Sequence, residues 1–156
     1  MVPRSEKPPL QLASFLPYRL STLSNRISRA IADLYEERFQ LTLPEWRVMA
    51  VLGEEPDLSA TEVAERTAMD KVAVSRAVNR LIEAGRLERH FAADDKRRSV
   101  LALSAHGRRV YRQIVPLAIN YEEALLERLT AKEIDTLDGL LKKLERLQVQ
   151  TGRTTD

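Results

Sequence analysis

Two short helical segments separated by a three-residue break constrain the fold of this chain most. Ser59-Ala-Thr-Glu62 is a capping box, in which a serine and a glutamate three residues apart satisfy the first free N–H groups of a helix. Thr67 to Met69 interrupts the helical pattern, and Asp70 is a typical N-cap for a second helix that ends at Gly85. Two helices joined by so short a turn are typical of a helix-turn-helix.

The residues before this unit predict two further helices. Apolar side chains recur every three or four residues from Pro17 to about Phe39, which places them on one helix face. Thr42-Leu-Pro-Glu45 is a second capping box with proline in the first helical turn. This capping box is expected to begin a short helix that ends at Gly53.

The residues after Gly85 predict a β-hairpin and two more helices. Residues 87–91 and 99–103 are short, partly alternating segments on either side of a charged loop, which is typical of a hairpin. Ser104 is expected to begin a helix that runs to about Arg128, and a third capping box begins the last helix at Thr130. The predicted fold class is therefore mainly α, with one small β-hairpin.

The second helix of the helix-turn-helix has two distinct faces. Val74, Ala77, Val78 and Leu81 fall together on a helical wheel and are predicted to face the core. The opposite face offers guanidinium, amide and hydroxyl groups and an apolar side chain, which are groups that read base edges in a major groove. A plain solvated helix face has the same composition, so this pattern alone leaves both interpretations open. The predicted DNA-reading residues are Lys71, Val72, Ala73, Ser75, Arg76, Asn79 and Arg80.

Three adjacent cations, Lys96, Arg97 and Arg98, lie at the tip of the predicted hairpin. Folding gains nothing from such a cluster, whereas a cationic tip can lie on phosphates or enter a narrow minor groove. A solvated turn is the alternative. Asp95 is better explained as a partner that orients a nearby arginine than as a DNA contact.

Charge is distributed unevenly along the chain, although its total is only +2. Residues 71–98 contain eight basic and four acidic side chains, whereas residues 121–149 contain five and seven. A basic segment at the predicted helix-turn-helix and hairpin favours a nucleic-acid partner. With no cysteine and only two histidines, His90 and His106, which lie in no ligand cluster, we expect no metal and no cofactor.

Other classes of protein fit the sequence poorly. There is neither an apolar run of membrane-spanning length nor an N-terminal signal core, so we expect no membrane partner, no export and a cytoplasmic location. The carboxylates lie mostly at helix starts or on outer helix faces, and no Ser-His-Asp or phosphate-loop pattern occurs. We therefore expect that the protein is not an enzyme.

The order of these motifs resembles the MarR family of winged-helix transcriptional regulators. The resemblance extends over nearly the whole chain and is most specific in its centre. It is carried by Leu58-Ser-Ala-Thr-Glu-Val-Ala-Glu65, Val74-Ser-Arg-Ala-Val-Asn-Arg-Leu81, Gly85-Arg-Leu-Glu-Arg89, the wing signature Asp95-Lys-Arg97 and Leu101-Ala-Leu-Ser-x-x-Gly107.

The resemblance implies four segments and a dimeric assembly. Residues 41–103 would form a winged helix-turn-helix lobe that binds DNA. Residues 1–40 would form an N-terminal arm and dimerisation helix, residues 104–149 the C-terminal dimerisation helices, and residues 150–156 a disordered tail. The implied protein is a homodimer whose terminal helices interlock and whose two lobes bind a palindromic DNA site.

The resemblance also implies roles for single residues of the lobe. Ser75, Arg76 and Arg80 would lie in the major groove. Arg97 would be the wing-tip arginine, and Asp95 would position the wing.

The terminal segments favour a dimer on their own composition. Their leucine stripes are larger than a chain of 156 residues with thin ends can easily bury. Gly139 lies inside the last helix, where glycine costs about 1 kcal/mol against alanine, and the close approach of a second helix would explain it. A monomer that folds these helices onto its own lobe is the alternative.

Members of this family usually release DNA when a small molecule enters a crevice between the dimerisation helices and the DNA-binding lobe. We therefore expect a repressor released from its operator by a small ligand, such as an aromatic acid or its thioester. The absent cysteines exclude sensing by thiol oxidation. The alternatives are a winged-helix protein-interaction module without sequence-specific DNA binding and, for Trp46 and Met49, a plain core role. The predicted pocket residues are Arg19, Leu23, Trp46, Met49 and Tyr111.

Overall fold

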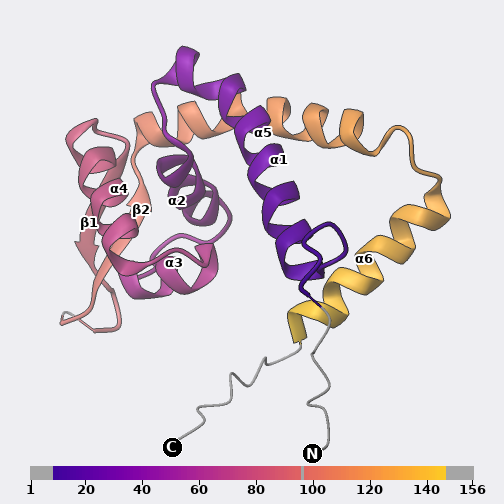
Figure 1. Cartoon of the computed structure of the whole chain (residues 1–156). Helices are drawn as coiled ribbons and strands as arrows, with labels where there is room; N and C mark the ends of the chain where they lie inside the picture. Colours follow the sequence, from indigo (N-terminus) through magenta and orange to yellow (C-terminus); the bar gives the residue numbers. More distant parts are fainter. Residues whose placement is uncertain (1–8, 96, 147–156) are drawn as a thin grey trace, which may run out of the picture. The chain divides into compact units, whose positions relative to one another are not determined.

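The computed structural model describes residues 9–95 and 97–146, which form six α-helices and one two-stranded antiparallel sheet (Figure 1). The predicted mainly α fold with one hairpin is confirmed. Lys96 and the predicted tail at residues 150–156 lie outside the described residues. The elements are α1 (Leu16–Phe39), α2 (Leu43–Glu54), α3 (Ala60–Thr67), α4 (Lys71–Glu83), β1 (Leu87–Phe91), β2 (Ser99–Leu103), α5 (Ala105–Leu126) and α6 (Ala131–Arg146).

The predicted capping boxes begin α2 and α3. Glu45 Oε2 accepts the N–H of Thr42 at 2.8 Å, and Glu62 Oε2 accepts the N–H of Ser59 at 2.7 Å. Gly85, just after α4, has a φ of +66°, a left-handed backbone conformation that favours glycine. The local signals therefore fix where the helices of the helix-turn-helix begin and end.

Gly53 does not end α2 as the sequence suggested. The helix continues to Glu54, and Gly53 lies inside it beneath the ring of Tyr111 from α5. A Cβ added to Gly53 would lie 2.5 Å from two carbons of that ring. The prediction was wrong because glycine here allows an aromatic side chain to approach the helix closely, rather than supplying a left-handed turn.

The core lies where α2, α3, α4 and the hairpin meet. Helix α2 contacts α3, α4 and β2, helix α4 contacts β1, and α1 packs on α2. Val74, Ala77, Val78 and Leu81 of α4 are all buried, which confirms the face predicted from the helical wheel. Burial of this apolar face fixes the orientation of α4 about its own axis and turns its polar face outward.

The chain divides after Leu117 into two units, and the division falls within α5. The first unit contains α1 to α4, the hairpin and the first half of α5, and the second contains the rest of α5 and all of α6. In α6 none of the described residues is buried, and its leucines are exposed. The finer division at residues 40, 103 and 149 stays a prediction.

None of the helices within residues 9–95 and 97–146 has the length and apolar character that crossing a membrane requires.

Candidate nucleic-acid interface

The outward face of α4 brings the predicted reading residues together. Asp70 Oδ1 accepts the N–H of Ala73 at 2.8 Å, which fixes the start of the helix. Val72 is 60% exposed, although it is a large apolar side chain that folding would bury. Ala73 is half-buried, and the exposed residues of this face are Lys71, Val72, Ser75, Arg76, Asn79 and Arg80. The face therefore presents an apolar group beside several hydrogen-bond donors.

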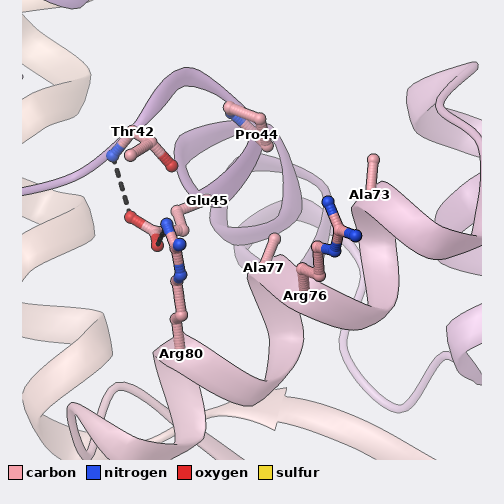
Figure 2. A pocket seen from close by; sticks show the side chains of 7 residues that line it. All are labelled: Thr42, Pro44, Glu45, Ala73, Arg76, Ala77 and Arg80. Carbon is pink, nitrogen blue, oxygen red and sulfur yellow. Dashed lines mark hydrogen bonds and ion pairs between the residues drawn. The ribbon is translucent and has the colours of Figure 1, made fainter.

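Arg76 and Arg80 border a hollow of about 230 Å³ between α4 and the start of α2 (Figure 2). Across it, Arg80 Nη1 lies 3.8 Å from Glu45 Oε1. The Glu45 side chain is only 8% exposed, whereas that of Arg80 is 67% exposed. Figure 2 shows these two side chains pointing toward one another. A buried carboxylate thus faces an arginine that still reaches solvent.

The tip of the hairpin is ordered by Asp95. Its Oδ1 accepts the N–H of Arg97 at 2.9 Å, and its carbonyl oxygen accepts the N–H of Arg98 at 3.0 Å. The guanidinium of Arg98 lies 3.4 Å from Asp94 and 3.7 Å from Glu62 of α3. Arg98 therefore ties the wing to α3, whereas the exposed side chain of Arg97 makes no ion pair with the described residues.

Hydrogen bonds lower the pKa of the two carboxylates beside Arg98. The pKa of Glu62 is lowered mainly by the hydrogen bonds from Ser59, and Arg98 and Arg66 lower it further. The pKa of Asp94 is lowered first by its own backbone N–H and then by Arg98. Both carboxylates therefore stay charged beside Arg98 down to a lower pH than ordinary Glu and Asp side chains do.

The acidic partners of the arginines predicted to bind DNA were not found from the sequence. The sequence indicated that Glu45 and Glu62 cap helices, but not that each also faces an arginine. A contact between His90 Nε2 and Asp57 Oδ1, at 2.8 Å, likewise joins the hairpin to the segment before α3. No sequence signal identifies these pairs because the partners lie far apart along the chain.

Comparisons with known proteins agree with this geometry. The family model described as MarR family matches residues 39–98, which extend from the end of α1 to the wing. A crystal structure of a MarR/EmrR family transcriptional regulator from Acinetobacter sp. ADP1 is 30% identical and has a TM-score of 0.81; the match covers 87% of this chain and 96% of that one. The chain belongs to the MarR family. It is therefore a DNA-binding transcriptional regulator of the winged-helix class, a family of regulators and not of enzymes.

Two further solved structures of transcriptional regulators bear on the site. Mutant MarR from E. coli, solved in complex with operator DNA, is 25% identical with a TM-score of 0.73, over 88% of this chain and 99% of that one. The PcaV transcriptional regulator from Streptomyces coelicolor, solved in complex with its natural ligand, is 26% identical with a TM-score of 0.69. The match covers 89% of this chain and 97% of that one.

The structure places the five residues predicted for a MarR-type effector pocket in different surroundings. Arg19 and Leu23 line a hollow along α1, and Trp46 lines a separate hollow. Tyr111 stacks on Trp46 with ring centroids 5.9 Å apart and lines a third hollow. Met49 is fully buried, which is the plain core role that the sequence left open.

The hollow beside Tyr111 combines an aromatic ring with cations from α5. It measures about 250 Å³ and is bordered by the end of α2, the end of β2 and the start of α5. Arg108 Nη1 donates to the carbonyl oxygen of Leu103 at 2.6 Å, whereas Arg112 is exposed and makes no ion pair with the described residues. A small anionic aromatic molecule matches this lining.

Within residues 9–95 and 97–146, no three side chains of the metal-binding types lie together in a way that would hold a metal ion.

Proposed function

We propose that this MarR-family regulator is a repressor that binds a palindromic operator as a homodimer and leaves it when a small aromatic acid, or its thioester, binds. The observation that carries the DNA-binding part is the outward face of α4, which presents Arg76, Asn79 and Arg80 in the same lobe as a wing whose Arg97 is exposed. The mutant E. coli MarR structure holds operator DNA, which supports operator binding here.

The side chains of α4 divide by chemistry into reading and positioning contacts. Arg76 and Arg80 suit guanine, Asn79 suits adenine, and Val72 suits the methyl group of thymine. We assign Lys71 and Ser75 to the phosphate and base edges near the start of the helix, where Ala73 allows close approach. Arg97 and the predicted contact Lys96, which lies outside the described residues, complete the surface at the wing.

The homodimer is supported by apolar surface that a single chain leaves uncovered. Leu16, Leu20 and Leu23 of α1 are 48%, 40% and 54% exposed, although they share one helix face. Burial of a leucine side chain contributes about 1.5–3 kcal/mol, so covering these faces stabilises an assembly strongly. In α6 the exposed leucines are Leu137, Leu140, Leu141 and Leu144.

The ligand response is supported by the hollow beside Tyr111. Arg112 offers a guanidinium for a carboxylate, and the ring of Tyr111 offers a face for an aromatic group. The structure of PcaV holds that protein's natural ligand, which supports ligand control here. A thermal-shift screen of aromatic acids and their thioesters tests this part, since a ligand at 100 times its Kd adds about 2.7 kcal/mol of stability. Arg112→Ala should abolish the shift.

The DNA-binding part is tested by titrating salt against duplex binding. Each phosphate contact contributes about −0.9 to the slope of log K against log salt, so two lobes with about four contacts each predict a steep dependence. Duplexes selected from a random library should share a palindromic motif, and Arg76→Ala should relax preference at one base pair of each half-site. Weak, salt-insensitive binding with no selected motif would indicate a protein-interaction module instead.

A further inference from the structure

We propose that Glu45 is a positioning residue that directs Arg80 toward its base and so sets sequence preference at one base pair without touching DNA. This inference rests on the proposed DNA-reading role of α4. It concerns a residue at the start of a different helix, α2, whose side chain lines the hollow beside Arg80.

The carboxylate of Glu45 is fixed by the helix that it caps. One oxygen accepts the N–H of Thr42 at 2.8 Å, and the other lies 3.8 Å from Arg80 Nη1. Because the first contact holds the carboxylate and the side chain is only 8% exposed, the carboxylate has little freedom to turn away. The flexible partner in this pair is Arg80, whose side chain is 67% exposed.

The electrostatics of the hollow favour this arrangement. Glu45 is the one acidic residue among the described residues that line it, and Arg76 and Arg80 are its cations. A buried carboxylate is costly unless a cation compensates for it. Glu45 therefore favours those conformations of Arg80 that keep the guanidinium near its carboxylate. A side chain restricted before binding loses less conformational freedom when it meets DNA.

Helix capping alone does not account for the placement of Glu45. The capping box of α6 has the same chemistry, since Glu133 Oε2 accepts the N–H of Thr130 at 2.8 Å. Glu133 is exposed and makes no ion pair within the part of the chain that the structure describes. The capping glutamate that faces α4 is instead buried and paired, which points to a role beyond the cap.

Glu45→Gln separates the two roles, because glutamine also serves in a capping box but carries no charge. We would select duplexes from a random library with the full-length wild type, with Arg80→Ala and with Glu45→Gln, and measure affinities for single-base variants of the selected site. Arg80→Ala identifies its base pair by a loss of discrimination of about tenfold there. Glu45→Gln should reduce discrimination about threefold to tenfold at the same base pair and leave discrimination at the other base pairs unchanged. Glu133→Gln is the matched control and should select the wild-type motif.

Three results would overturn the proposal. In the first, the wild type selects a motif and Glu45→Gln discriminates as well as wild type at the Arg80 base pair. This result contradicts the positioning role but not the proposed function. A uniform loss at every base pair together with a lower melting temperature shows a purely structural residue. A further loss from Glu45→Gln in an Arg80→Ala background shows that Glu45 acts through another group. If Glu45→Gln does not fold, Glu45→Asp, which draws the carboxylate back from Arg80, should lose discrimination at the same base pair.

A wild type that selects no motif at all contradicts the proposed function itself, and the positioning role falls with it. The two failures are therefore distinguishable by the wild-type selection alone.

Discussion

A Cβ placed on Gly107 would lie 2.0 Å from the carbonyl oxygen of Arg86, far inside van der Waals contact. The same carbonyl accepts the N–H of Ser104 at 3.0 Å, and Ser104 Oγ donates to the carbonyl oxygen of Gly85 at 2.6 Å. The first turn of α5 is thus bound directly to the turn that ends α4. The start of a predicted dimerisation helix therefore fixes the end of the predicted recognition helix.

Gly107→Ala should lower the free energy of unfolding by about 2 kcal/mol or more, because backbone atoms on both sides must move to admit the methyl group. Urea denaturation measures this change. His106→Ala, at an exposed position in the same turn, is the control and should remain within about 0.5 kcal/mol of wild type. Equal stability of the two variants would contradict the close approach.

Arg97→Ala and Arg98→Ala should differ although the residues are adjacent. Arg97 is exposed and outside the ion pairs described for the wing, so its loss should weaken binding to all duplexes and reduce the salt slope by about 0.9 for each phosphate contact removed. Arg98 lies between Glu62 and Asp94, so Arg98→Ala should loosen the wing, which hydrogen exchange of β1 and β2 would detect. Identical salt slopes for wild type and Arg97→Ala would show that Arg97 contacts no phosphate.

Tyr35→Phe should leave the free energy of unfolding unchanged or raise it by about 1 kcal/mol. The hydroxyl of Tyr35 is buried and has no hydrogen-bond partner among the described residues, so phenylalanine keeps the ring and removes an unsatisfied polar group. Chemical denaturation measures the difference, with Tyr111→Phe as the control at a half-buried ring. A clearly lower free energy of unfolding in Tyr35→Phe would instead show that the hydroxyl has a hydrogen-bond partner in the assembled protein.

Alkaline titration should reveal the same tyrosine. Burial, and next the charge of Glu36, raise the pKa of Tyr35 to about 12, although Arg47 lowers it in part. In the unfolded chain this tyrosine ionises near pH 10, so below that pH the hydroxyl is neutral in both states and the pKa shift has no effect on stability. As the pH rises from 10 toward 12, the unfolded tyrosine ionises first, which lowers the free energy of unfolding by about 2–3 kcal/mol. Tyr35→Phe should lack this part of the alkaline destabilisation, and an unchanged pH profile would contradict the shift.

Gly139→Ala tests the dimer from within α6. Nothing among the described residues lies within 4 Å of a Cβ added to Gly139, so alanine should favour the isolated helix by about 1 kcal/mol. If a second chain packs closely there, the variant should instead dissociate more readily, which sedimentation velocity at falling concentration would show. Lys143→Ala, on an exposed part of the same helix, is the control. A variant that is more stable and equally dimeric would rule out close packing at Gly139.

Local sequence signals were sufficient for the elements and for the face of α4. Capping boxes and apolar periodicity depend on residues three or four positions apart, so they can be recognised from the sequence alone. The same reasoning failed at Gly53 because a glycine can end a helix or admit a close neighbour. The neighbour, Tyr111, comes from a different helix. The sequence also did not show that Arg19, Trp46 and Tyr111 line separate hollows, because side chains of α1, α2 and α5 meet only after packing.

The sequence by itself determined that this chain forms a winged helix-turn-helix with a basic centre, and which side of α4 faces outward. Only the tertiary structure decided what each arginine does there. Arg98 is held by Glu62, Arg80 faces the buried Glu45, and Arg97 remains exposed. These differences arise from ion pairs between residues distant along the chain, whose energy depends on burial and on distance, and neither exists before the helices pack.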